Sequence, residues 1–182
     1  MSNSSTDRAF TVEFTKGEVE FGPASHEIWD TFLDHLKRRD RAGGELMLVQ
    51  KCCTSLSVNE ATGAHQLLAY LDDEPASISC IADEIESISG GHFEAEPDGR
   101  EVTCSGFRFG SPNRMQWDSF QLDLADENYR GGAASRKLLG AIVDDEQGFV
   151  AWLKANPAAL ASVIMPVTKL AGRGIKITRK KA

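Results

Sequence analysis

The chain carries an internal repeat, and this repeat limits the possible folds more than any other feature. Residues 21–32 read FGPASHEIWDTF, and residues 109–120 read FGSPNRMQWDSF. Phe-Gly opens both segments, Trp-Asp-Ser/Thr-Phe closes both, and Trp117 lies 88 residues after Trp29. A repeat of this kind predicts two similar structural units, each with its own small core.

The similarity continues towards the end of each copy. LLAYLDDEPA (67–76) matches FVAWLKANPA (149–158), and IADEIESISG (81–90) matches VIMPVTKLAG (163–172), now at a spacing of 82 residues. The first copy therefore has the longer loop, which we place in SVNEATGA (57–64). The resulting division comprises a mobile leader at 1–11, a first unit at 12–91, a linker at 92–99, a second unit at 100–174 and a basic tail at 175–182.

Each unit opens with alternating apolar and polar residues around a short turn. TVEFTKGEVEF turns near Lys16-Gly17, and EVTCSGFRF turns at Ser105-Gly106. Period-two alternation around a glycine-containing turn predicts a β-hairpin. The PDG segment at 97–99 is a further turn signal, which we assign to the linker.

Apolar residues at helical spacing predict a helix after each hairpin. Pro23 and Pro112 suit the first turn of these helices, because proline lacks the N–H that is unused there. Gly43-Gly44 and Gly131-Gly132 are then expected to break the chain before a second helix at 46–53 and 133–143.

Two further helices complete each unit. A short third helix is expected over 63–71 and 146–153. The fourth begins at Pro75 or Pro157, with Asn156 as a capping residue, and ends at Gly90-Gly91 or Gly172. Pro166 falls inside the last helix. The fold class is therefore α+β and mainly helical, with two units that each consist of a hairpin and about four short helices.

The aromatic residues at matching repeat positions are predicted to be structural anchors. Trp29 and Phe32 in the first copy correspond to Trp117 and Phe120 in the second. Aromatic side chains at helical spacing usually belong to a core, so we expect all four to be mostly buried. The alternative is an exposed aromatic binding surface.

The sequence contains no convincing catalytic or metal-binding pattern. Cys52 and Cys53 are adjacent, which suits neither a CxxC pair nor a zinc site. Together with Cys80 and Cys104 they are predicted to be reduced, buried and apolar in role, as is usual in a reducing cytoplasm. The four histidines are scattered, with His65 expected on a helix. We therefore predict no catalytic residue, no metal and no cofactor.

Charge distribution bears on the possible partners. The net charge of −7 argues against general nucleic-acid binding, and no run of apolar residues is long enough to span a membrane. The N-terminus lacks the apolar segment of a secretory signal. The acidic run at 72–74 is expected to stabilise a helix start. The basic tail is expected to be solvated or to bind an acidic partner through Lys176, Arg179, Lys180 and Lys181.

The phrases quoted above also resemble those of a known family. FGPASHEIWDTFLDHL, the LVQKCC segment, LLAYLDDEPA and IADEIESISGG occur in one order between residues 12 and 91, and more weakly between 102 and 174. This order resembles the tail assembly chaperones of tailed bacteriophages. The family has one such unit, whereas this chain has two.

The resemblance implies a non-enzymatic protein of the host cytoplasm, with no catalytic residues or cofactors. Such chaperones bind the long, apolar, helical tape-measure protein during virion assembly. The alternative from another class is a structural adaptor of a virion or another assembly. A chaperone is expected to be absent from purified particles and an adaptor to be present, whereas an enzyme has no supporting residues here. The sequence does not identify the partner, the host or the oligomeric state.

Overall fold

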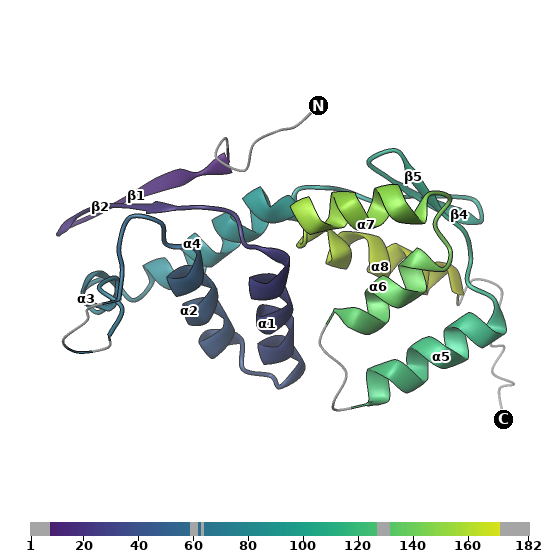
Figure 1. The fold of residues 1–182 in the computed structure, drawn as a ribbon, viewed down its shortest axis with the longest axis horizontal. Helices are drawn as coiled ribbons and strands as arrows, with labels where there is room; N and C mark the ends of the chain where they lie inside the picture. Colours follow the sequence, from purple (N-terminus) through teal and green to yellow (C-terminus); the bar gives the residue numbers. More distant parts are fainter. Residues whose placement is uncertain (1–7, 59–61, 63, 127–131, 172–182) are drawn as a thin grey trace, which may run out of the picture.

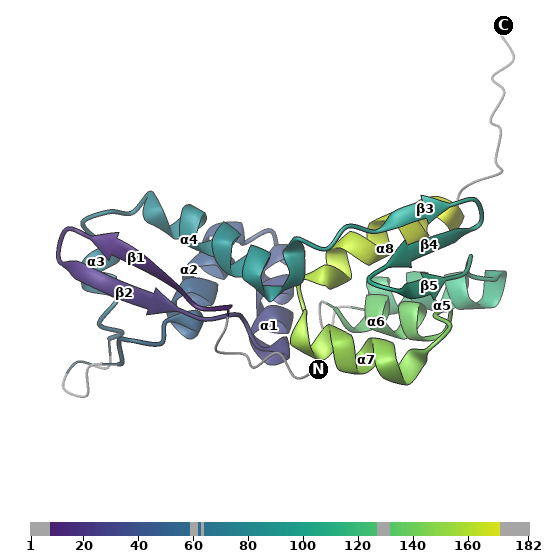
Figure 2. The same cartoon turned by 90° about the horizontal axis from the view of Figure 1, so that it is seen from above.

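The structure is a computed structural model that describes residues 8–58, 62, 64–126 and 132–171. The chain is elongated, with its first half at one end and its second half at the other (Figures 1 and 2). The predicted α+β, mainly helical fold class is confirmed. The basic tail residues Lys176, Arg179, Lys180 and Lys181 lie outside the described residues, as does most of the predicted leader.

The first half is a hairpin followed by helices. Its strands pair antiparallel, with Val12 opposite Val19 and Phe10 opposite Phe21, so the apolar residues share one face. The elements are β1 (Phe10–Phe14), β2 (Gly17–Phe21), α1 (His26–Lys37), α2 (Arg41–Cys52), α3 (Leu68–Leu71), α4 (Ser77–Glu86) and the π-helical turn η2 (Ser87–Gly91).

The second half keeps this order and adds one strand. Its hairpin turns at Ser105-Gly106, where both residues have positive φ angles, as a two-residue hairpin turn requires. The elements are β3 (Glu96–Asp98), β4 (Glu101–Cys104), β5 (Phe107–Phe109), α5 (Arg114–Ala125), α6 (Ala133–Gly140), α7 (Glu146–Ala155) and α8 (Ala159–Ala171).

Both halves attach the end of the hairpin to the second helix in the same way. The Gly22 amide donates to the carbonyl of Cys52 at 2.9 Å, and the Gly110 amide donates to the carbonyl of Ile142 at 3.0 Å. In each half a neighbouring pair runs in the opposite sense: Thr54 donates to Glu20, and Asp144 donates to Arg108. This correspondence agrees with a duplicated unit; the duplication itself stays a prediction.

The predicted leader and linker both contain strand residues. β1 begins at Phe10, inside the segment assigned to the leader, and Arg8 bonds the side chain of Asn156 at 2.8 Å. β3 lies inside the predicted linker and pairs with β4, which makes the second sheet three-stranded. The PDG turn signal was right about a turn at Gly99, which has φ +60°, but it missed the strand before that turn.

Several predicted helix boundaries are wrong. Ser25 and Asn113 cap α1 and α5, so Pro23 and Pro112 precede these helices and do not enter their first turns. Asn156 ends α7, and its side-chain amide donates to the Trp152 carbonyl, so it does not cap the last helix. The predicted third helix of the first unit is reduced to the four residues of α3, whereas its counterpart α7 is longer than expected.

Gly43 and Gly44 lie within α2 and do not break the chain. The Asp40 carboxylate caps α2 by accepting from the Gly43 amide at 3.0 Å. A Cβ atom on Gly44 would come within 2.9 Å of the His35 Cβ and 3.1 Å of the Phe32 ring. Glycine is therefore required here for the close packing of α1 against α2. The Gly43-Gly44 pair predicts a break in the chain, but in the structure Gly44 marks a close contact between two helices.

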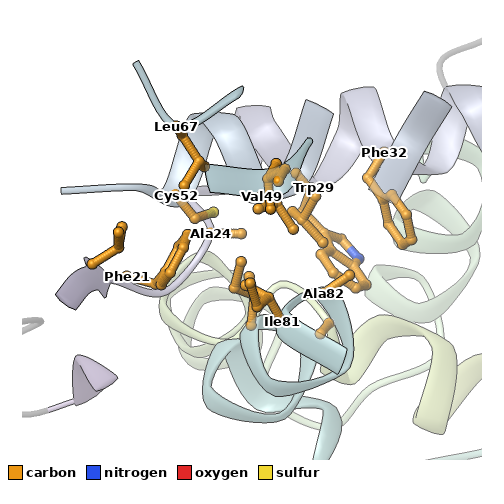
Figure 3. Packing of buried hydrophobic residues seen from close by; sticks show 14 of the residues in the cluster. Phe21, Ala24, Trp29, Phe32, Val49, Cys52, Leu67, Ile81 and Ala82 are labelled. Carbon is orange, nitrogen blue, oxygen red and sulfur yellow. The ribbon is translucent and has the colours of Figure 1, made fainter. Parts of the chain in front are cut away.

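The first core is built around the predicted anchors of the first unit. Trp29 and Phe32 are buried, and their ring centroids lie 5.0 Å apart. Figure 3 shows Trp29 next to Ala82 of α4 and Phe32 on the other side of Trp29, with Phe21, Val49, Cys52 and Ile81 among the other side chains of the cluster. The second core includes the buried Phe120, while Trp117 packs against its edge and stays partly exposed.

The two halves meet through polar and apolar contacts. The Arg136 guanidinium on α6 holds the buried Asp30 carboxylate on α1 with two bonds of 2.6 and 2.7 Å. Ala158 of the second half lies in the first core, and Leu33 of the first half packs against the second. The halves are therefore joined by a substantial interface in addition to the connecting chain.

Candidate binding surface

An apolar groove runs between α5 and α6 in the second half. It has a volume of about 220 Å³, and its floor is formed by Phe120 and Leu138 with the small side chains of Ala134 and Ala141. Met115 and Ser119 lie along the α5 side. Small residues on the floor leave room for an apolar side chain from another molecule.

Two large apolar side chains of α5 are exposed in or near this groove: Met115 belongs to its lining, and Leu122 lies one position before the lining residue Asp123. Met115 is 80% exposed and Leu122 is 72% exposed. These positions are seven residues apart, which places them on the same side of α5. Asp118 and Ser119 lie between them on this side of the helix, so Met115 and Leu122 offer two separate apolar contacts beside the groove.

The equivalent helix of the first half does not share this surface. At the repeat spacing of 88 residues, Met115 corresponds to Glu27 and Leu122 to Asp34. The apolar surface on α5 is therefore a property of the second half alone, and the repeat pattern does not require it.

Polar contacts fix the two helices that form the groove. Asn113 and Gln116 form a reciprocal capping box at the start of α5. The Gln116 side chain also donates to the Ala141 carbonyl at 3.1 Å, which ties α5 to the end of α6. Lys137 on α6 bonds Asp123 on α5 at 2.7 Å. These bonds link α5 to α6 on both sides of the groove lining.

The predicted anchors contribute to this surface unequally. Phe120 forms part of the floor, and Trp117 stacks beside it with ring centroids 5.4 Å apart. Trp29 and Phe32 lie in the first core, away from the groove lining. The sequence analysis missed Met115 and Leu122. A comparison of the two copies could have found them, because acidic residues occupy the matching positions, Glu27 and Asp34, in the first copy.

The cysteines are less uniform than predicted. Cys52 and Cys104 are buried, Cys53 is half-buried and Cys80 on α4 is exposed, so the prediction of four buried thiols is wrong for Cys80. Burial raises the pKa of Cys52 to about 12, with a smaller contribution from neighbouring Cys53, and burial also raises the pKa of Cys104. All four are free thiols.

The histidines make separate local contacts. His35 bonds the Asp40 carboxylate at 2.8 Å and, with the Gly43 amide, lowers the pKa of Asp40. His65 lies in a β-bridge opposite Val58 and not on the helix predicted for it. His92 contacts the Ser87 carbonyl. In the part of the chain that the structure describes, no three His, Cys, Asp or Glu side chains are grouped so that they could hold a metal ion.

The acidic run at 72–74 holds the hairpin turn and does not cap a helix. Glu74 accepts from both the backbone amide and the hydroxyl of Thr15 at 2.8 Å, and these bonds, the backbone one first, lower its pKa. Lys16 bonds Asp73 at 2.7 Å. The N-terminus of α4 has no side-chain cap. Thr15 and Glu74 are 59 residues apart, so no local sequence pattern predicts their contact.

Comparisons with protein-family models, with curated proteins and with solved structures found no match for this chain. Among the described residues, no helix is long and apolar enough to cross a membrane.

Proposed function

We propose that this chain is a non-enzymatic binding protein that captures an apolar helical segment of a partner during phage tail assembly. The observation that carries the proposal is the apolar groove between α5 and α6, with the exposed Met115 in its lining and the exposed Leu122 on the same side of α5 as Met115. The resemblance of the sequence to tail assembly chaperones supplies the biological context and the expected partner, a tape-measure-like protein.

The shape of the surface favours a helix as the occupant. α5 has twelve residues and is therefore about 18 Å long, enough to lie along three turns of a partner helix. A shallow groove between two helices suits the apolar face of a third helix, whose side chains recur on one side. The charged lining residues Asp123 and Lys137 bond each other. Apolar contacts are therefore the main source of affinity for a partner helix.

The test replaces these two exposed apolar residues of α5 by the residues at the matching positions of the first unit. Met115→Glu with Leu122→Asp introduces side chains that the equivalent helix already carries, so the fold should tolerate them. Burying a Met or Leu side chain contributes about 1.5–3 kcal/mol, so losing both contacts should weaken binding at least tenfold. Binding is measured by fluorescence anisotropy with a labelled helical peptide that carries leucine and alanine along one face.

Met165→Glu is the matched control. Met165 is also exposed, but it lies on α8 outside the groove lining, so this variant should bind normally. Wild-type binding should persist at raised salt, because it rests on apolar burial. Equal affinity of the Met115→Glu/Leu122→Asp variant and the wild type would exclude this side of α5 and its groove as the binding site.

A second experiment decides between the chaperone and the structural adaptor. A chaperone is expected to be absent from purified particles while it co-purifies with the tape-measure protein from infected cells. Stoichiometric amounts in purified particles would instead support the adaptor. This outcome is independent of which surface makes the contact.

A further inference from the structure

A second cavity is lined by residues of both halves of the chain. Its volume is about 320 Å³, so it can accept a group much larger than a water molecule. Its lining comes from three separate parts of the chain: Arg8 before β1, Pro23 to His26 at the start of α1, and Lys154-Ala155 at the end of α7.

Basic side chains dominate this lining. Arg8, His26 and Lys154 line the cavity, and no acidic side chain does. This is unexpected in a chain whose formal net charge is −7. Arg8 and Lys154 carry the formal positive charges, and two such charges that line one hollow favour an anion there.

Arg8 and Lys154 keep donor atoms that are not bonded to any residue that the structure describes. Arg8 is anchored through Nη1, which donates to the Asn156 Oδ1 atom at 2.8 Å, and its Nε and Nη2 atoms have no hydrogen bond to any residue that the structure describes. Lys154 is exposed and likewise makes no ion pair with a described residue. Asn156 is itself buried and is fixed by its bond to the Trp152 carbonyl, so the anchored guanidinium has a defined position.

His26 reports the local electrostatics. Desolvation by the surrounding protein lowers its pKa, and the positive charges of Arg136 and Lys154 lower it further. Asp30, whose carboxylate lies 3.6 Å from the His26 ring on the same helix, and Glu27 act in the opposite direction but do not outweigh these effects. Burial is the largest of these effects, and the lowered pKa leaves the His26 ring uncharged at pH 7.5, where it can still donate one N–H bond.

We propose that this cavity binds a small phosphorylated anion through Arg8, His26 and Lys154. A phosphate dianion carries two negative charges and three terminal oxygens, which can accept hydrogen bonds from the three side chains that line the cavity. The positive end of the twelve-residue helix α1 adds to the same field. A carboxylate has one charge and two oxygens, and would leave part of this set unused.

This site is independent of the α5–α6 groove. Because its donors come from both halves, a bound phosphate would hold the halves together and stabilise the folded chain against unfolding. Binding is expected to be weak for inorganic phosphate and stronger for a phosphorylated molecule that also fills the rest of the cavity.

The test measures binding of inorganic phosphate and of methyl phosphate to the full chain by calorimetry at low ionic strength and pH 7.5. Acetate and chloride at matched ionic strength are the controls. Lys154→Gln should weaken phosphate binding about three- to tenfold, because it removes one partly solvated cation. Lys51→Gln makes the same charge change on the exposed surface of α2, outside the cavity, and should leave the affinity unchanged.

A direct signature is the titration of His26 followed by NMR, with the signal assigned through His26→Gln. Phosphate should raise the pKa of His26 in the wild type, and the rise should shrink in the Lys154→Gln variant. Comparable affinities for inorganic phosphate and methyl phosphate would show that the phosphate group alone is recognised. A preference for one of them would show whether the ligand is free phosphate or a phosphate ester. Equal effects of acetate and phosphate, or equal losses in Lys154→Gln and Lys51→Gln, would overturn the proposal.

Discussion

Removal of the Arg136 guanidinium should destabilise the chain more than removal of any exposed charge. Arg136→Met leaves the Asp30 carboxylate, which is only 8% exposed, without its two charge-assisted bonds. At an effective dielectric of about 20, the attraction lost is about 4 kcal/mol. Breaking a buried pair by removing one partner typically costs about 3–5 kcal/mol.

The expected cost is about 3 kcal/mol, at the lower end of this range, because Arg136 is 21% exposed and water partly solvates the pair. For a chain of this length, such a change lowers Tm by about 6–12 °C. Chemical denaturation followed by circular dichroism measures the free energy of unfolding. The double variant Asp30→Asn/Arg136→Met should recover part of the loss, because it no longer leaves a buried charge unpaired.

The repeat supplies the control. Asp118 is the counterpart of Asp30 at the spacing of 88 residues, but it pairs with Arg114 on the surface, with side chains 61% and 94% exposed. Asp118→Asn should therefore change stability by less than about 0.5 kcal/mol. If Arg136→Met costs no more than Asp118→Asn, or if the two changes in the double variant simply add, the argument that this ion pair joins the halves is refuted.

Two further predictions concern the buried side chains. Trp29→Ala should lower the free energy of unfolding by about 3–5 kcal/mol, and Trp117→Ala by clearly less because Trp117 is partly exposed. Trp29→Phe should cost least, since the buried Trp29 Nε1 atom has no hydrogen-bond partner among the described residues. Thermal melts in which Trp117→Ala is the most destabilised variant would contradict this order. A maleimide should label the exposed Cys80 thiol rapidly in the folded protein and should reach the buried Cys52 and Cys104 only on unfolding. Cys80→Ser is the control. Rapid labelling of this variant at Cys52 or Cys104 would show that reagent reaches the core of the folded protein.

The hairpins and the order of the helices were predictable because local patterns determine them. Alternation around Gly17 and around Ser105-Gly106 specifies a strand pair and its turn, whatever the rest of the chain does. Apolar residues at helical spacing likewise specify the buried side of α1, with Trp29 and Phe32. The errors fall where a distant contact decides the outcome.

Gly44 illustrates this limit. Alone in the sequence it reads as a helix breaker, yet α2 continues through it because α1 approaches too closely for a side chain. Glu74 is similar: its carboxylate bonds Thr15, a residue 59 positions earlier, and no local pattern contains that contact. The strand β3 depends on pairing with β4, so it was assigned to a linker. Each of these features follows from packing between segments that are remote in the sequence.

The same comparison between copies locates the candidate site. Positions that face a shared core keep their apolar character in both copies, as Phe32 and Phe120 do. Positions facing solvent have no such constraint and would ordinarily be polar, as Glu27 and Asp34 are. The exposure of Met115 and Leu122 instead carries a cost in solubility without a gain in folding stability. A partner that covers these two side chains offsets that cost. Binding should therefore be tested first at the groove beside them, before the aromatic anchors.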